Sequence, residues 1–319
     1  PAGPFSWSHV AESKLDDLIA TENIGYFSGS HNGYQRLADP VKHSREVLFM
    51  KSGVESPMPP YLIVRDRFDA CEHHRYSMNY HFSPGCRASV TGDQIEVASS
   101  NHSGNNSGNN SGLILASFGT TPPHSEVNKS WISRCYGQCE LAPMASVTAA
   151  GKGTQSFATL IVPVSVEKPV KYNRQAVPPL GECGFKISLG NTQDTVLIGD
   201  QASRLNSGFL SAVGALAWLR VLGGRAVHAG LVDGQELEVG GSLEFISQTV
   251  VNHCFLEFRK DWLEVSLQGT DNFQMVFHSP LKRVVINGAS FLLERRVRRA
   301  TFEKDINGWQ LKLAQMAMA

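Results

Sequence analysis

The sequence has no long hydrophobic run and no excess of charge of either sign. Its most apolar stretch, residues 209–222, is too short to span a bilayer and contains Arg220, so we expect no membrane span. Lysine and arginine together number 29, and so do aspartate and glutamate. A chain without net positive charge is not expected to bind nucleic acid through bulk electrostatics. A local basic groove for an acidic sugar stays compatible with this balance.

The usual cysteine motifs for metal binding and redox chemistry are also absent. The six cysteines form no CxxC pair, so the sequence predicts neither a zinc ribbon nor a thioredoxin-like motif. Cys135 and Cys139 lie in the segment CYGQC. On a regular strand they would lie about 13 Å apart, which is too far for a disulfide. Only a turn at Gly137 would bring them together, and we expect reduced, partly buried thiols.

Little of the sequence is patterned as helix. Residues 13–20 (SKLDDLIA) favour one or two helical turns, and residues 208–222 favour either a short helix or a buried strand. The other signals are short strands separated by turns. Among them, residues 157–166 (FATLIVPVSV) form a continuous apolar run that is typical of a central sandwich strand.

Two dipeptides in the second half, Asp233-Gly234 and Asn287-Gly288, are typical of two-residue hairpin turns. Many short strands at near-regular spacing indicate stacked antiparallel sheets rather than an α/β fold. The predicted fold class is therefore all-β, with an antiparallel β-sandwich followed by a smaller β-rich domain.

The chain is longer than one hydrophobic core usually organises. Proline and glycine interrupt the strand pattern over residues 168–184, so we place the division there and expect domains at 1–170 and 171–319. Residues 99–112 (SSNHSGNNSGNNSG) are small and polar, and we expect them to form a flexible surface loop because they bury too little area to offset the entropy of ordering.

One group of polar residues has the composition of a metal site. Asp66, His73, His74 and His81 lie close together in the sequence, and zinc needs three or four such ligands on converging elements. The segment contains neither HxH nor HExxH, however. Hydrogen-bonded structural histidines are the favoured interpretation, and a metal-dependent enzyme built on these residues is a weaker hypothesis.

A second group suits an acidic sugar. Arginine binds a carboxylate through two hydrogen bonds, and a nearby tyrosine or histidine can transfer a proton. We therefore consider Tyr34 and His43 as candidate catalytic residues and Arg36, Arg45 and His31 as candidate substrate-binding residues. The alternative is that Arg36 and Arg45 are cross-strand partners on a hairpin, with Tyr34 packed on the sheet.

A basic run at residues 295–299 (RRVRR) has two interpretations. It either grips a polyanion or forms the solvated edge of a sheet, where charge blocks edge-to-edge pairing. No glycine-rich phosphate loop, nucleophile elbow or Ser/His/Asp order is recognisable in the sequence.

Three segments in the first half carry a resemblance. They are residues 29–48 (GSHNGYQRLADPVKHSREVL), 61–85 (YLIVRDRFDACEHHRYSMNYHFSPG) and 131–143 (WISRCYGQCELAP). Taken in this order, they resemble the C-terminal β-sandwich region of heparinase II/III-type polysaccharide lyases and related alginate lyases. The second half resembles that family only in being β-rich.

The resemblance implies a supersandwich-like antiparallel fold that faces an N-terminal α/α toroid, with a sugar cleft between them. The implied reaction is β-elimination on uronate-containing acidic polysaccharides, in a periplasmic or extracellular location. The toroid has no counterpart in this chain, and the family's H-x-H-x-D segment is not found in residues 1–30. We therefore transfer no catalytic or zinc residue and expect no cofactor in this chain, although the resemblance is compatible with a structural zinc in the parent protein.

Two expectations about function follow from this resemblance. The leading one is that the chain is the β-sandwich part of such a lyase, with an acidic polysaccharide and the toroid as partners, and that it is inactive alone. The alternative is a non-catalytic carbohydrate-binding or structural β-sandwich module. The chain begins at Pro1 without a visible secretory signal, so a removed leader stays compatible with either expectation.

Overall fold

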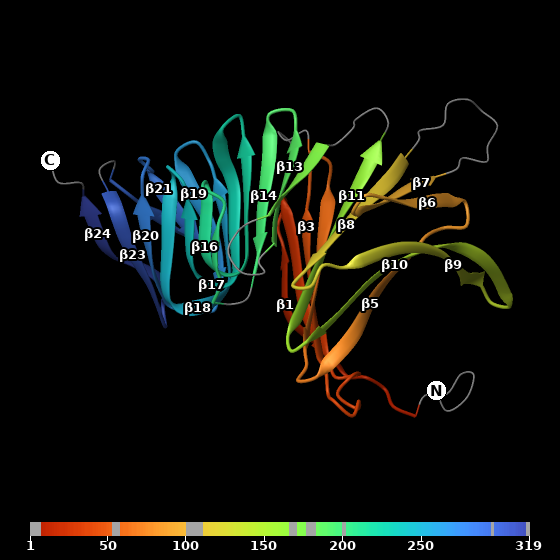
Figure 1. Ribbon diagram of the computed structural model, residues 1–319. Coiled ribbons are helices and arrows are strands. Elements are labelled where there is room, and N and C mark those ends of the chain that lie inside the picture. Colours follow the sequence, from red (N-terminus) through yellow and green to blue (C-terminus); the bar gives the residue numbers. More distant parts are fainter. Residues whose placement is uncertain are drawn as a thin grey trace. The chain divides into compact units, whose positions relative to one another are not determined.

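The protein is seen in a computed structural model that describes residues 8–52, 58–99, 111–165, 171–176, 183–199, 202–294 and 297–316. In these ranges every regular element is a β-strand (Figure 1), which confirms the predicted all-β class. The described residues include no helix long and apolar enough to cross a membrane. The chain divides into two compact units, Pro1–Pro169 and Val170–Ala319, and each is described by itself.

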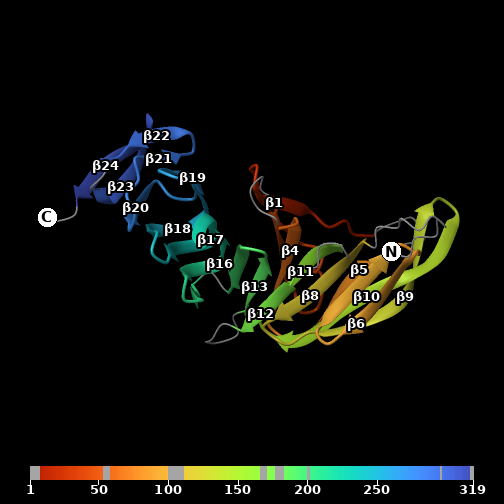
Figure 2. The ribbon, with the colours of Figure 1, turned by 90° about the horizontal axis from the view of Figure 1, so that it is seen from above.

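Unit 1 contains two antiparallel sheets. The larger sheet has the order β1-β2-β3-β4-β11-β8-β7-β6, and the smaller has the order β5-β10-β9. Figures 1 and 2 both show β9 and β10 running side by side as a long hairpin. The strands are β1 (Ser13–Ala20), β2 (Ile24–His31), β3 (Lys42–Met50), β4 (Tyr61–Asp69), β5 (His73–His81), β6 (Cys86–Thr91), β7 (Gln94–Ser99), β8 (Ser111–Gly119), β9 (His124–Cys135), β10 (Gln138–Lys152) and β11 (Gln155–Ser165).

The two sheets of unit 1 enclose a hydrophobic core. The larger sheet contributes Phe68 from β4 and Phe157 from β11, and the smaller contributes Met78 from β5 and Val147 from β10. β11 lies between β4 and β8, so the prediction of a central sandwich strand at this apolar run is confirmed. The antiparallel β-sandwich is therefore the observed architecture of the first half.

The β1–β3 end of the larger sheet is more open than its centre. Leu18 of β1 and Phe27 of β2 are paired across the ladder and are 64% and 38% exposed. The ladder register shifts between Leu15 and Asp17, which marks a β-bulge in β1. The prediction of helical turns over these residues was wrong, because pairing with β2 overrides the weak local preference.

The loop and cysteine predictions of unit 1 have separate outcomes. Of the predicted loop at 99–112, residues 100–110 lie outside the described residues, while Ser99 ends β7 and Ser111 begins β8. A turn at Gly137 is present: this residue has a φ of 78° and joins β9 to β10. Cys135 and Cys139 flank this turn as exposed, free thiols, so the expectation of reduced cysteines holds, although they are not partly buried.

The described residues of unit 2 form one sheet, which is antiparallel except where β19 pairs with β21 in parallel. Its long strands β16, β17 and β18 lie side by side in Figures 1 and 2. The strands are β12 (Lys171–Ala176), β13 (Cys183–Leu189), β14 (Thr192–Ile198), β15 (Arg204–Asn206), β16 (Leu210–Leu222), β17 (Arg225–Val239), β18 (Leu243–Phe258), β19 (Trp262–Gln268), β20 (Asn272–Phe277), β21 (Arg283–Ile286), β22 (Ala289–Leu292), β23 (Val297–Asp305) and β24 (Gly308–Met316).

The core of unit 2 is built from the apolar residues of these long strands. Leu219, Leu231 and Phe245 are among its fully buried members. The apolar run near residue 210 is thus strand β16, which resolves the choice between helix and strand. The predicted basic run lies partly outside the described residues, since only Val297 to Arg299 are seen, at the start of β23.

The two predicted Xaa-Gly hairpins differ in the structure. Asn287 and Gly288 have φ values of 47° and 87° and join β21 to β22, as predicted. Asp233 also has a positive φ, of 46°, but it lies inside β17, next to the register shift between Gly234 and Glu236, so the hairpin prediction was wrong there. The same local conformation serves a β-bulge at this place.

Candidate functional site

Four of the predicted polar residues of the first half meet on one face of the larger sheet. His31 of β2 pairs with His43 of β3, and Arg45 of β3 pairs with Asp66 of β4. Directly paired residues, and residues two apart on one strand, lie on the same face of a sheet. The register therefore brings these four side chains together, although they are spread over three strands.

Asp66 is the buried centre of this cluster, with an exposed fraction of 2%. Its Oδ1 accepts hydrogen bonds from His43 Nε2 at 2.7 Å and from Arg45 Nε at 2.8 Å, and its Oδ2 accepts one from Arg45 Nη2 at 3.1 Å. Burial would raise the pKa of Asp66, but the hydrogen bonds from His43 and Arg45 outweigh it, so the pKa is lowered. Asp66 is consequently an anion that holds two partners in place.

The histidines form an oriented chain of hydrogen bonds. The Gly33 N–H donates to His31 Nδ1 at 3.1 Å, so a neutral His31 carries its proton on Nε2. His31 Nε2 then donates to His43 Nδ1 at 2.7 Å, and His43 Nε2 donates to Asp66. Burial lowers the pKa of His31, and His43 and Arg45 lower it further, in agreement with a neutral His31.

Aromatic contacts tie this chain to the core. The rings of His43 and Phe68 are stacked with centroids 4.5 Å apart and an interplanar angle of 7°. Phe68 stacks in turn on Tyr76 of the smaller sheet at 4.5 Å. Stacked rings restrict the orientation of His43, so the direction of its hydrogen bonds is fixed by packing.

Two members of the cluster face solvent. The Arg45 side chain is 49% exposed, and its hydrogen bonds to Asp66 raise its pKa. Tyr34 is 44% exposed, and its ring meets the His31 ring edge to face at 5.1 Å. A hollow of about 540 Å³ at Tyr34 is lined by Tyr34, His31 and Arg36 among others. Arg45 and Tyr34 are the groups that a ligand would meet first.

Arg36 occupies a different place from the one in the hairpin alternative. It lies in the connection between β2 and β3, whereas Arg45 pairs across the sheet with Gly29 and Asp66. The interpretation of Arg36 and Arg45 as cross-strand partners is therefore wrong. Arg36 still reaches the solvent-facing site, through the hollow that it shares with Tyr34.

The predicted metal residues do not converge. His73 and His81 are the two ends of β5, about 26 Å apart for a strand of that length, and Asp66 is occupied by His43 and Arg45. His74 bonds to Asp39 at 2.6 Å instead. Within the described ranges, no group of three or more His, Cys, Asp or Glu residues is placed to hold a metal ion.

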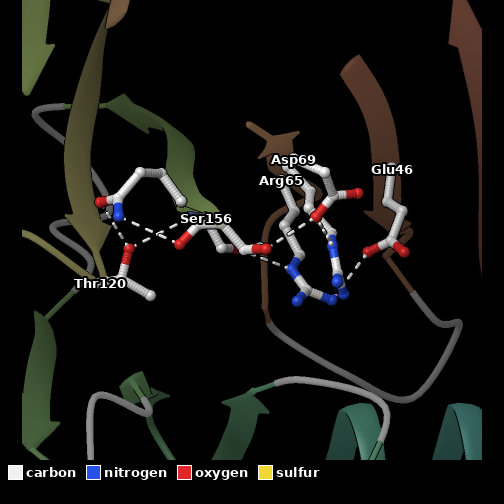
Figure 3. A network of polar contacts seen from close by, with 8 residues as sticks. Glu46, Arg65, Asp69, Thr120 and Ser156 are labelled. Atoms are coloured by element: carbon white, nitrogen blue, oxygen red, sulfur yellow. Dashed lines mark hydrogen bonds and ion pairs between the residues drawn. The ribbon is translucent and has the colours of Figure 1, made fainter. Parts of the chain in front are cut away.

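A separate polar network occupies the opposite face of β4 (Figure 3). Arg65, which is 4% exposed, donates from Nε to Ser156 Oγ at 3.0 Å and from Nη1 to Glu46 Oε2 at 3.3 Å. The Ser156 N–H donates to Thr120 Oγ1 at 3.2 Å. These contacts link β3, β4 and β11 beneath the site, so they support the strands that carry His43, Arg45 and Asp66.

Comparison with known proteins places this sandwich in a family. The family described as "Heparinase II/III-like, C-terminal" matches residues 1–186. The chain therefore belongs to the heparinase II/III-like family, as a C-terminal region of it, and the predicted resemblance is confirmed. No curated protein matches the chain.

Solved structures of a heparan sulfate lyase and a heparinase III match part of the chain at low sequence identity. The heparan sulfate lyase HepC from Pedobacter heparinus has a TM-score of 0.45 and 14% identity, over 59% of this chain and 28% of that protein. A heparinase III gene product has a TM-score of 0.43 and 15% identity, over 66% of this chain and 28% of that protein. The chain thus spans little more than a quarter of the length of these lyases.

Proposed function

We propose that this chain is the β-sandwich part of a polysaccharide lyase that cleaves uronate-containing acidic polysaccharides by β-elimination. Family membership supports the reaction class. The observation that carries the proposal is the oriented chain from Asp66 through His43 to His31, with Arg45 and Tyr34 exposed beside it. In this proposal the partners are the acidic polysaccharide and an α/α toroid of the same protein, in the periplasm or outside the cell.

Arg45 has the right chemistry to bind the uronate carboxylate. Asp66 accepts hydrogen bonds from the Nε–H and one Nη2–H of Arg45. Both Nη1–H groups and the second Nη2–H are left to donate to a ligand. Hydrogen bonds to the uronate carboxylate stabilise the negative charge that develops when the C5 proton leaves. Asp66 and His43 position Arg45 and His31 rather than touch the sugar.

Tyr34 is the candidate for proton transfer. In β-elimination the C5–H electron pair becomes the C4–C5 double bond, and the bond from C4 to the glycosidic oxygen breaks. A phenolate accepts the C5 proton and a phenol protonates the leaving oxygen. Tyr34 is exposed and its ring lies against His31, and this accessibility supports the role that the proposal gives it.

The test is a lyase assay on the 319-residue chain and on the full-length protein that its gene encodes, read by the ultraviolet absorbance of the new double bond. We expect no product from the chain alone and product from one polyuronate with the full-length protein. Arg45→Ala and Tyr34→Phe should each lower kcat/KM at least about a hundredfold, since each removes a group that acts in the transition state.

Trp131→Ala is the matched control, because Trp131 is 65% exposed on β9 and lies in the smaller sheet. It should leave kcat/KM unchanged. Absence of product from the full-length protein on every polyuronate would sink the proposal. Wild-type rates in both site variants would remove the assignment of Arg45 and Tyr34.

A non-catalytic glycan-binding sandwich is the second candidate, favoured by one specific observation. Both ring nitrogens of His31 and of His43 already have hydrogen-bond partners, so neither histidine offers a free base to a ligand. Retardation of the chain on a polyuronate gel, without product from the full-length protein, is the result that this candidate predicts.

A further inference from the structure

The sheet of unit 2 forks at β18. β18 pairs with β20 from Leu243 to Ser247, and with β19 from His253 to Phe258. Beyond β18 one branch continues to β21 and β22, while the other continues to β23 and β24. A strand that changes partners in this way spreads the two branches apart at the change.

A hollow of about 530 Å³ lies at this fork. It is lined by the middle of β18, the connection from β19 to β20, and the ends of β23 and β24, all within unit 2. Its volume is within the range of pockets that hold small ligands. The hollow is remote in sequence from the Tyr34 site and lies outside the part of the chain that the family matches.

The fork is shaped by tight local structure. Gly269 has a φ of 99°, and a Cβ there would lie 2.6 Å from the backbone N of Asn252. Thr270 Oγ1 accepts hydrogen bonds from Ser247 at 3.2 Å and Thr249 at 3.1 Å and donates to the Asn272 carbonyl at 2.8 Å. These contacts hold the walls of the hollow in place without a ligand, which reduces the entropy that binding costs.

The lining combines one aromatic ring with polar groups. Trp309 is half-buried. Its ring packs edge to face against the ring of the core residue Phe273, with the two centroids 5.3 Å apart. Gln248 and Gln268 line the same hollow and are exposed. A fixed indole gives a flat apolar surface, and amides donate and accept hydrogen bonds in one group. A sugar ring has an apolar face that can stack on the indole and hydroxyl groups around it that can hydrogen-bond to the amides.

The charged residues at the hollow limit where an acidic group of a ligand can bind. Lys304 is the cross-strand partner of Trp309, so its ammonium lies on the same face as the indole. Asp271 also lines the hollow, and its backbone carbonyl accepts a hydrogen bond from the Lys304 N–H at 2.7 Å, so the Asp271 carboxylate belongs to a residue next to Lys304. An acidic group on a bound ring is therefore favoured only where it contacts the Lys304 ammonium and stays clear of the Asp271 carboxylate.

We propose that the fork of β18 is a saccharide-binding site, in which a sugar ring stacks on Trp309, hydrogen-bonds to Gln248 and Gln268, and places an acidic substituent at Lys304. It would hold a stretch of the polysaccharide away from the Tyr34 site. The proposal rests on the proposed function only in the choice of acidic glycans as probes, since the hollow itself is described by its own residues.

Affinity electrophoresis of the 319-residue chain tests this site, with heparan sulfate, hyaluronan, alginate and neutral dextran in separate gels. We expect wild type to be retarded by at least one acidic glycan. Trp309→Ala should weaken the apparent affinity about tenfold or more, the usual effect of removing an aromatic anchor. Lys304→Ala should weaken binding to the acidic glycan and leave any binding to dextran unchanged.

Two controls keep the outcome interpretable. Trp262→Ala removes another half-buried tryptophan of unit 2 that does not line the hollow, and it should bind as wild type does. Trp309→Phe keeps an aromatic ring on Phe273 and should retain most of the affinity if Trp309→Ala acts by losing the stacking surface rather than by unfolding.

The results separate this site from the proposed lyase activity. Retardation that is lost in Trp309→Ala but kept in Arg45→Ala supports the fork site, whatever the lyase assay gives. Equal retardation of wild type and Trp309→Ala, or no retardation of wild type by any of the four glycans, overturns it. Neither of these results bears on product formation by the full-length protein.

Discussion

Two aspartates in this molecule each hold an arginine through two hydrogen bonds, and their surroundings differ. Arg45 and Asp66 are cross-strand partners in unit 1, and Arg220 and Asp194 are cross-strand partners in unit 2. Their hydrogen-bond lengths are 2.8 and 3.1 Å in the first pair and 2.8 and 2.7 Å in the second. The side chains of Arg220 and Asp194 are both 1% exposed, whereas that of Arg45 is 49% exposed.

The comparison teaches that the residue pair alone does not define a site. In the buried pair every charge is enclosed, so its contribution is to the fold. In the open pair the carboxylate is enclosed and the guanidinium faces solvent. His43 is hydrogen-bonded to the same carboxylate, and His31 is hydrogen-bonded to His43. Substitutions in the two pairs and a titration of His31 test this difference, with effects expected to decrease in that order.

Replacing Arg220 by leucine should produce the largest change. The substitution leaves the Asp194 carboxylate buried without its arginine, which costs about 3–5 kcal/mol of unfolding free energy. Urea unfolding followed by tryptophan fluorescence measures this cost. The double substitution Asp194→Val and Arg220→Leu should recover most of the loss, because it removes both charges. A single-variant loss below about 1 kcal/mol would show that the buried pair is not the structural contact inferred here.

Replacing Asp66 by asparagine should have an intermediate effect of about 2 kcal/mol, since it weakens hydrogen bonds to charged partners. The folded state lowers the pKa of Asp66, so its stabilisation is present above the unfolded value of about 3.9 and is lost as the pH falls through the folded pKa. The difference between wild type and Asp66→Asn in urea unfolding should therefore shrink below about pH 4.

Asp69→Asn is the matched comparison for that experiment, because the Asp69 side chain is 36% exposed and pairs with Arg67 at 3.1 Å. An exposed pair contributes about 0–1 kcal/mol. If the two aspartate variants lost equal stability, the central role given to Asp66 would be wrong.

The smallest effect is expected in the titration of His31. Burial, His43 and Arg45 lower the pKa of His31, so its ring should titrate below the ordinary value of about 6.5 in an NMR experiment. Arg45→Gln should raise this pKa only in part, because burial is the largest cause. Arg67→Gln, on the other face of β4, should leave it unchanged. A His31 pKa above the ordinary value would contradict the neutral hydrogen-bond chain.

The sequence predicted the fold well where the local residue pattern favoured the same conformation that the sheet requires. The apolar run of β11 and the Asn287-Gly288 turn are examples. It failed where long-range pairing decided the outcome. Residues 13–20 form a strand because β2 is beside them, and Asp233 lies within the continuous strand β17 where its dipeptide predicts a hairpin turn. Local preference cannot reveal a partner that lies elsewhere in the chain.

The same dependence on long-range strand pairing explains which residues of the candidate site could be predicted and which could not. The sequence identified Tyr34, His43 and Arg45 by their chemistry, yet grouped Asp66 with His73 and His81 because those residues are near it in the sequence. Asp66 in fact forms hydrogen bonds with residues of the preceding strand, and the strand register that brings them together cannot be read from the sequence. Alternation was the available signal: His43 and Arg45 are two residues apart and so share a face, as Asp66 and Phe68 do.

The strand order of the two units also has a consequence for how fast each one forms. In unit 2 most neighbours in the sheet are consecutive in the chain, as in the series β16, β17, β18 and β19. In unit 1, β11 must pair with β4, and its residue Ser156 is 91 positions from its partner Arg65. Chains with distant pairings refold more slowly, because a long loop must close before the contacts form. After dilution from denaturant, unit 2 should therefore acquire its native tryptophan signal from Trp218 before β11 closes the sandwich of unit 1.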